Sequence, residues 1–249
     1  MSFNRLRVLT YNIHKGFNVN RQFMLPAMQQ AITQVDADIV FLQEVRGEHL
    51  RQQRRIKEWP ANSQTEFLAS QTWPYYVYGK NAVYPHGHHG NAFLSKLPLL
   101  AWENINLANQ INASRSMLHA VLQLPDTPLP LHIICIHLGL FKKERAYQLQ
   151  ALSQRIEALV PHHEPLVIAG DFNDWRIHAK DYLETFLDVK EVFQTLTGDY
   201  AKTFPIWRPV LRVDRIYYRA LKPLHCQVLA KKPWLNLSDH TALYAEFEW

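Results

Sequence analysis

Residues 165–174 read PLVIAGDFND. The aliphatic run at 166–169 predicts a buried strand, and Asp171 and Asn173 follow directly at its end. An aspartate in this position often caps a turn or a helix. However, a carboxylate that a buried strand delivers is costly unless it is paired or binds a cation. The segment therefore also predicts a functional site at the end of a strand.

The same pattern, an apolar run that ends in a carboxylate, amide or imidazole, recurs five more times. The segments are TYNIH at 10–14, FLQEV at 41–45, IHLG at 136–139, VDRI at 213–216 and LSDH at 237–240. Each segment alone has a structural explanation, because such side chains commonly satisfy local hydrogen bonds. Six of them in one chain predict a convergent polar site, in which hard oxygen ligands would suit Mg²⁺ or Mn²⁺.

Short β-rich runs recur along the whole chain. They cover 6–13, 38–45, 75–78, 91–94, 117–124, 131–138, 166–169, 213–218 and 241–247. Apolar stripes predict only two helices, at 23–35 and 146–159, and the basic stretch 46–57 fits either a helix or a solvated face. This pattern predicts an α+β layered sandwich rather than a regular βαβ repeat. Because there is no repeat or linker, we expect a single domain over 1–249.

Composition limits the class of protein. Of the 249 residues, 47% are hydrophobic and 20% charged, as in an ordinary globular protein. No apolar run reaches the roughly 20 residues needed to span a bilayer, and the N-terminus lacks a secretory layout. Two cysteines make no disulfide framework, and Cys135 is expected to be a buried strand thiol. We therefore expect a cytoplasmic monomer.

The net charge is +5 and the pI about 9.1. A basic surface suits a polyanionic partner, such as nucleic acid or an anionic lipid surface. A modest positive balance is equally consistent with a role in solubility alone, because charge carries no specificity.

The ordered motifs resemble the endonuclease/exonuclease/phosphatase superfamily, whose members are DNase I-like. The most specific pieces are LQEV at 42–45, GDFN at 170–173 and SDH at 238–240, in that order. Together with YNIHKG at 11–16, HHGN at 88–91 and GNAFLSKLP at 90–98, they are most similar to a bacterial branch of YbhP-like hydrolases. The resemblance covers nearly the whole chain. It implies a four-layer α/β/β/α sandwich of two mixed β-sheets flanked by helices.

The resemblance also implies a metal site. Glu44 matches the family's principal metal-binding glutamate, and Asn12 matches its early asparagine. Asp239 would supply a further carboxylate to the metal or to its water shell. The expected ion is Mg²⁺, with Mn²⁺ as the alternative. His14 stands where some members have a metal-binding aspartate, which argues against a second metal there; the number of metals stays open.

Five residues match catalytic positions of the family. Asp171 matches an aspartate that orients or deprotonates the attacking water, and Asn173 would hold that water or a phosphate oxygen. His240 matches the terminal histidine, and Asp214 the aspartate that fixes its tautomer. His137 matches a second histidine that contacts the phosphate or the leaving group. Whether Asp171 or His240 is the general base stays open.

Further residues are candidates for substrate binding. The histidine-rich stretch 84–90 lacks the spacing of a structural zinc site, so we expect a flexible loop at the rim of the active site. His89 and Asn91 would contact substrate from there. Arg115 fits either a phosphate-binding fork or a surface salt bridge. Trp207 fits stacking on a base, insertion at a lipid interface or packing within the core.

The sequence therefore predicts a Mg²⁺-dependent hydrolase that cleaves phosphodiesters or phosphomonoesters with activated water. Nucleic acid is the favoured substrate because of the basic charge, and a phospholipid or phosphorylated head group is the alternative. A non-catalytic relative that binds nucleic acid or membrane is the rival class. It is disfavoured because every catalytic position identified above carries a competent residue type.

Overall fold

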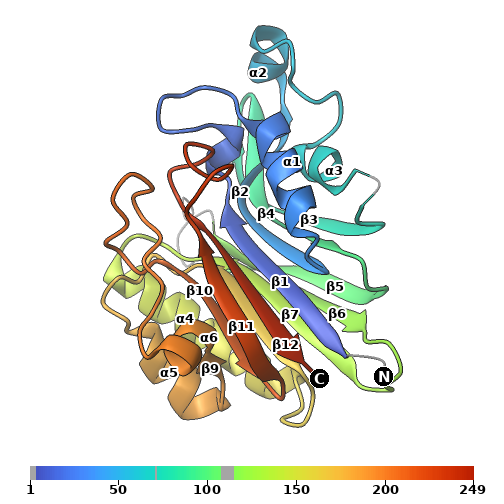
Figure 1. Ribbon diagram of the computed structural model, residues 1–249, viewed down its shortest axis with the longest axis vertical. Coiled ribbons are helices and arrows are strands. Elements are labelled where there is room, and N and C mark those ends of the chain that lie inside the picture. The colour runs from blue at the N-terminus through green and yellow to red at the C-terminus, as the bar shows by residue number, and fades with distance from the viewer. Residues whose placement is uncertain (1–3, 71, 108–114) are drawn as a thin grey trace.

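The computed structural model describes residues 4–70, 72–107 and 115–249, and its strands form two sheets (Figure 1). The first sheet contains β1 (Arg5–Asn12), β2 (Ile39–His49), β3 (Tyr75–Tyr84), β4 (Gly87–Ser95), β11 (Lys222–Leu229) and β12 (Ala242–Glu248). The second contains β5 (Leu99–Asn106), β6 (Ser116–Gln123), β7 (Pro130–His137), β8 (Leu166–Asp171), β9 (Lys190–Glu191) and β10 (Asp214–Arg219).

Both sheets are mixed. The strand orders are β11-β12-β1-β2-β4-β3 and β5-β6-β7-β8-β10-β9. One parallel pair lies inside each sheet, β1 with β2 and β7 with β8, and the other pairs are antiparallel. A parallel pair needs a crossover, which α1 (Leu25–Val35) and α4 (Lys142–Leu159) supply.

The two sheets pack face to face around an apolar core. On the first sheet the core includes Phe41 and Phe93, and on the second Leu118, Ile133 and Ile216, all fully buried. Side chains alternate between the two faces of each strand, so the remaining apolar residues point away from this core toward the helices. The two sheets thus form the inner layers of a sandwich, and a layer of helices lies outside each sheet.

The helical layers differ in size. Outside the first sheet lie α1, the short α2 (Leu50–Arg55) and α3 (Gln64–Ala69), and the 3₁₀ turn η1 (His14–Gly16). On the other side α4 and α5 (Ala179–Leu187) cover the second sheet, with α6 (Val192–Thr197) near its edge. Met28 and Ile32 of α1 are buried against the first sheet, and Leu152 and Ile156 of α4 against the second. The four-layer α/β/β/α sandwich is confirmed.

All nine expected strand regions and both expected helices are present, and α2 takes the helical alternative for part of the basic stretch 46–57. The elements that were not predicted are β5, β9, β11, η1, α3, α5 and α6. β5 and β11 are edge strands in which every residue is exposed or partly exposed, so burial does not impose an apolar pattern on them. α2, α3 and α6 have only six residues each, too few for a periodic stripe.

The stretch 84–90 is not the loop that was expected. β3 runs to Tyr84 and β4 starts at Gly87, so the histidines lie on a two-strand hairpin with Tyr84 paired to Gly87. Gly87, with φ of 157°, sits where a Cβ would meet the backbone oxygen of Glu48. The basic stretch 46–57 begins as the end of β2 and continues as α2, none of whose residues is buried.

Candidate active site

Four of the predicted residues continue the inward-facing side of a strand beyond the apolar core. They are Asn12 on β1, His137 on β7, Asp171 on β8 and Asp214 on β10. On β7, Ile133 and Cys135 belong to the inner core, and His137 is next in the same alternation. Strand pairing sets His137 and Asp214 on either side of Asp171. Alternation and register therefore bring these polar groups together at one end of the sandwich.

Asp171 is the centre of this group. Its Oδ2 accepts a hydrogen bond across the two sheets from Asn12 Nδ2 at 3.1 Å, and its Oδ1 accepts from the Asn173 amide at 2.9 Å. Burial, reinforced by Asp214 and opposed by His240, raises the pKa of Asp171 to about 7. The carboxyl group can thus exchange a proton near neutral pH.

His240 and Asp214 form a buried pair. The imidazole Nδ1 lies 2.9 Å from Asp214 Oδ2, and Nε2 lies 3.8 Å from Asp171 Oδ2. Burial opposes the charged imidazole, but Asp214 raises the pKa of His240 to about 10. The ring of Phe204 packs on the imidazole at 4.9 Å between centroids. His240 is therefore a positively charged group with a fixed orientation.

His137 has the opposite protonation state. Arg115 Nη1 lies 3.2 Å from His137 Nδ1, and because arginine only donates, Nδ1 must accept. The remaining nitrogen, Nε2, then carries the proton and lies 3.4 Å from Asp171 Oδ2. Burial, with the charge of Arg115, holds the pKa of His137 well below its usual range. Arg115 is thus part of the site and not of a surface salt bridge.

A β-bulge in β2 aims Glu44 at the same place. The register with β4 shifts between Leu42 and Val45, and Glu44 has a left-handed φ of 57°. Because of the bulge, Leu42 and Val45 both pack on the helical side of the sheet. Glu44 therefore does not follow the alternation of faces along β2, and its side chain points toward the cleft that Asp171 and His137 also line. A left-handed φ on such a side chain is typical of functional sites.

A lysine and a histidine approach the predicted metal ligands. Lys15 Nζ lies 2.6 Å from Glu44 Oε2, and His14 Nδ1 lies 3.6 Å from Asp239 Oδ1. Burial works against the charged form of Glu44, but the ammonium group of Lys15 outweighs it and holds the pKa of Glu44 below its ordinary value. The carboxylates of Glu44 and Asp239 thus face a region that favours positive charge.

These side chains border one cleft of about 270 Å³. Its walls include Glu44, Arg115, His137, Asp171, Asn173, Asp239 and His240, together with Leu140, Trp175, Phe204, Leu211 and Val213. Asn173 has a left-handed φ of 50° and donates from Nδ2 to Leu138 O at 3.0 Å. Asn12 and Asp214 lie behind this surface, bonded to residues that form it.

The remaining candidates do not line the cleft. Asn91 is fully buried and donates to Ser116 O at 3.1 Å, so it supports the strands beneath the cleft and does not line it. His89 packs beside Tyr84, and burial, with Lys15, lowers its pKa to about 4. Trp207 is 74% exposed, which rules out packing within the core. Cys135 is buried and accepts a hydrogen bond from Gln43, as a strand thiol.

Lys15 and the apolar walls of the cleft were not singled out from the sequence. Lys15 lies in the motif at 11–16, but nothing in its spacing places its ammonium group on Glu44. That contact depends on η1, where His14 and Lys15 both have positive φ. Trp175 directly follows the motif at 170–174 and could have been found as its neighbour.

The structure also brings together a second set of potential metal ligands, besides Glu44 and Asp239. Among the residues that the structure describes, Asp171, Asp214 and His240 have ligand atoms within 4.8 Å of one another. Asp214 Oδ1 is buried without a hydrogen-bond partner in the described part of the chain. In this group the imidazole Nδ1 already pairs with Asp214, which suits proton transfer better than metal ligation.

The fold and this site define a class of enzyme. Residues 9–240 match the family model of the Endonuclease/Exonuclease/phosphatase family, and the chain belongs to that family. It is 43% identical over 241 residues to the protein YbhP of Escherichia coli strain K12, covering 96% of this chain and 95% of YbhP. The expected family and its YbhP-like branch are confirmed, and the chain is a phosphoester hydrolase by family.

Solved structures support the fold. An endonuclease/exonuclease/phosphatase from Beutenbergia cavernae DSM 12333 superposes with a TM-score of 0.80 at 19% identity, covering 98% of this chain and 72% of that one. D. rerio TDP2, complexed with a single strand DNA product, superposes with a TM-score of 0.73 at 20% identity, covering 98% and 99%. At these identities the likeness concerns the fold alone. No helix in the described residues is long and apolar enough to cross a membrane.

Proposed function

We propose that this chain hydrolyses phosphate esters with activated water in the cleft, and that the reaction depends on Mg²⁺ or Mn²⁺. The observation that carries the proposal is the convergence of two groups. The carboxylates of Glu44 and Asp239 border the same cleft as Asp171 and the charged His240. One group suits a cation, and the other suits proton transfer.

The residues around Glu44 fit a divalent ion. Glu44 and Asp239 provide hard oxygen ligands, and the Asn12 side chain, bonded to the amide of His14, holds the neighbouring backbone. The Lys15 ammonium group pairs with the Glu44 carboxylate, in the position that a metal cation would take. A bound metal would polarise a phosphoryl oxygen and stabilise the negative charge that develops in the transition state.

The chain's own residues would divide the remaining work. With a pKa of about 7, Asp171 fits the general base that takes a proton from water, while Asn12 and Asn173 hold its carboxylate in place. His240, with a pKa of about 10, would remain cationic and stabilise negative charge on a phosphate oxygen. The His137 Nε2 proton is available to a second oxygen, with Arg115 fixing the ring.

The substrate that carries the phosphate stays a prediction. The net charge of +5 supports nucleic acid, and TDP2, a relative in fold, has been solved with single-strand DNA. A phosphorylated lipid head group is the second candidate, because exposed apolar side chains surround the cleft. A cytoplasmic location and a monomeric state likewise remain predictions.

A substrate panel with and without EDTA tests the proposal. The panel contains an activated phosphodiester, duplex and abasic DNA, RNA, sphingomyelin, glycerophospholipids and phosphoinositides. We expect EDTA-sensitive hydrolysis that Glu44→Gln and His240→Ala both abolish. Asp199→Asn, which alters an exposed ion pair with Arg212, is the control. Activity that survives Glu44→Gln would sink the mechanism. Tight binding of nucleic acid or membrane without any hydrolysis would favour the non-catalytic rival.

A further inference from the structure

Three loops border the mouth of the cleft, and a fourth leads to it. They are residues 139–143, 175–178, 204–212 and 230–236, called the rim loops below. Leu140, Trp175 and Leu211 place the first three directly at the cleft. The fourth leads into the segment of Asp239, whose carbonyl accepts a hydrogen bond from the Ile206 amide at 2.8 Å. The loops before β10 and β12 thus lie side by side, on the upper left of Figure 1.

The rim loops expose large apolar side chains to solvent. Phe141 is 77% exposed and Trp207 is 74% exposed, more than any other aromatic side chain among the described residues. Four further residues on the same loops are exposed, namely Leu140, Trp175, Val210 and Leu235. A group of exposed apolar residues gathered around a site marks an interaction surface rather than ordinary surface variation.

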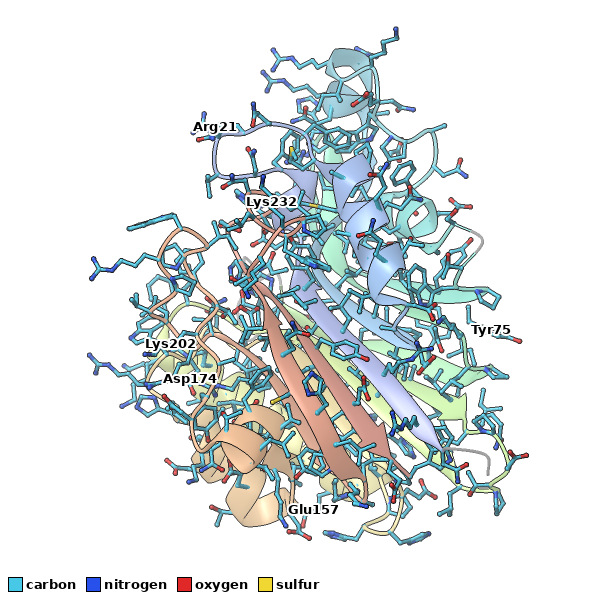
Figure 2. The ribbon with its side chains drawn as sticks, viewed as in Figure 1. Arg21, Tyr75, Glu157, Asp174, Lys202 and Lys232 are labelled. Atoms are coloured by element: carbon cyan, nitrogen blue, oxygen red, sulfur yellow. The ribbon has the colours of Figure 1, made fainter. Side chains whose placement is uncertain are left out.

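Basic side chains directly follow or neighbour these apolar ones. The exposed basic residues of the rim loops are Lys142, Lys143, Arg176, Arg208, Lys231 and Lys232. None of the four loops contains an aspartate or a glutamate. Figure 2 shows Lys232 among the loops in the upper half of the molecule, whereas Glu157 lies at the opposite end. The surface is therefore both apolar and positively charged, which is complementary to an anionic partner with an apolar interior.

Two anionic partners have this general chemistry, and the apolar residue types distinguish them. Single-stranded nucleic acid would use aromatic side chains for stacking, but Leu140, Val210 and Leu235 have no aromatic face. A bilayer uses aliphatic and aromatic side chains together at the boundary of its acyl chains, with lysine and arginine against anionic head groups. The mixture on the rim loops fits the bilayer better.

We propose that the rim loops dock this protein on an anionic phospholipid bilayer, with the mouth of the cleft facing the head groups. Leu140 and Phe141 would enter the head-group boundary on one side of the cleft, and Trp207 and Val210 on the other. Docking rests on these loops alone. Only its consequence, that the hydrolysed phosphate belongs to a lipid head group, rests on the proposed function.

Vesicle flotation tests the docking. The full chain is mixed with phosphatidylcholine vesicles, with or without phosphatidylglycerol, and the bound fraction is measured. The test variant combines Phe141→Ser with Trp207→Ser, and the matched control is Trp102→Ser, an aromatic residue 51% exposed on the edge strand β5. We expect binding to the anionic vesicles, a loss of at least about fivefold in the paired variant, and no change in the control.

Three results would overturn the proposal. The first is no binding to the anionic vesicles, and the second is an equal loss in the paired variant and the Trp102→Ser control. The third is binding of a single-stranded oligonucleotide that the paired variant loses while no vesicle binds, which would make the rim a stacking surface. Circular dichroism of both variants checks that they are folded.

The experiments distinguish a failure of the docking proposal from a failure of the proposed function. Glu44→Gln should float like the unaltered chain because Glu44 lies on β2, outside the rim loops. Flotation without hydrolysis of any ester in the panel would refute the proposed function and leave the docking intact. Hydrolysis of soluble esters without flotation would refute the docking alone.

Discussion

The ammonium nitrogen of Lys15 lies 2.6 Å from Oε2 of Glu44, in the region where we propose a divalent cation. Both residues have left-handed backbone conformations, with φ of 61° and 57°. Two separate local distortions, the η1 turn and the bulge in β2, are therefore needed to form this one contact. A partly buried lysine–glutamate pair at the expected metal ligand indicates that lysine and metal compete for the same carboxylate.

Replacing Lys15 by glutamine should tighten metal binding. Removing the positive charge frees Glu44 and takes away repulsion of the ion, so we expect the dissociation constant of Mn²⁺ to fall about tenfold or more. Isothermal titration calorimetry measures this without any substrate. Lys15→Arg keeps the charge and is the control, with an affinity close to that of the unaltered chain. Unchanged or weaker binding in Lys15→Gln would mean that Lys15 helps to hold the ion and does not compete with it.

Replacing Asp214 by asparagine should remove most of the activity while keeping the fold. Oδ2 of Asp214 lies 2.9 Å from Nδ1 of His240 and accepts its hydrogen bond. The neutral amide of asparagine would not stabilise the cationic imidazole. By analogy with other aspartate–histidine pairs, we expect kcat to fall on the order of 10³-fold or more. Hydrolysis of an activated phosphodiester gives the rate. Asp199→Asn serves as the control because its ion pair with Arg212 is exposed, and an equal loss there would refute the role of Asp214.

The sequence was sufficient for the parts of the site that follow strand alternation. Asn12, His137 and Asp171 each end an apolar strand, and the same alternation that buries the core turns them inward. Their order along the chain pointed to the family, and the family supplied the four layers. The apolar pattern of the strands could not predict the four layers by itself, because it does not show which strands pair.

The sequence was not sufficient where the backbone departs from regular structure. The bulge at Glu44 and the positive φ of Lys15 leave no trace in periodicity, so the contact between them was not expected. The exposure of Phe141 was not expected, and that of Trp207 was one of several open alternatives, because an aromatic residue in a loop can either pack inward or face solvent. The sequence also suggested a loop at 84–90, where strand pairing forms a hairpin instead.

Gly170 should tolerate no side chain. Its φ is 145°, and a Cβ there would lie 2.0 Å from the backbone oxygen of Ile136 on the neighbouring strand. Gly170→Ala must therefore push β7 and β8 apart next to Asp171, at a cost of about 3 kcal/mol or more in the free energy of unfolding. Gly198→Ala is the comparison, because that glycine ends α6 with φ of 82° and no atom within 4 Å. It should cost only about 1 kcal/mol, and similar losses in both variants would contradict the steric explanation.

Glu191 should make the protein less stable as the pH rises. Its carboxylate caps α6 through the Gln194 amide at 2.7 Å, but its Oε1 is buried without a partner among the described residues. Burial raises the pKa of Glu191 from 4.5 to about 7. Between these two values the unfolded chain releases its proton more readily than the folded one, so stability falls as pH rises through this window. Above about pH 7 the full cost is present, and below about pH 4 it is absent.

Replacing Glu191 by glutamine should therefore stabilise the protein at pH 8 and have little effect at pH 4. The full shift is equivalent to about 3 kcal/mol, and the weaker cap of glutamine leaves a gain of about 2 kcal/mol. Urea unfolding at both pH values measures the difference. Glu157→Gln, on the exposed face of α4, is the control and should show no dependence on pH. If Glu191→Gln instead loses the same stability at both pH values, the cap outweighs the cost of burial and the carboxyl group is not protonated in the folded chain.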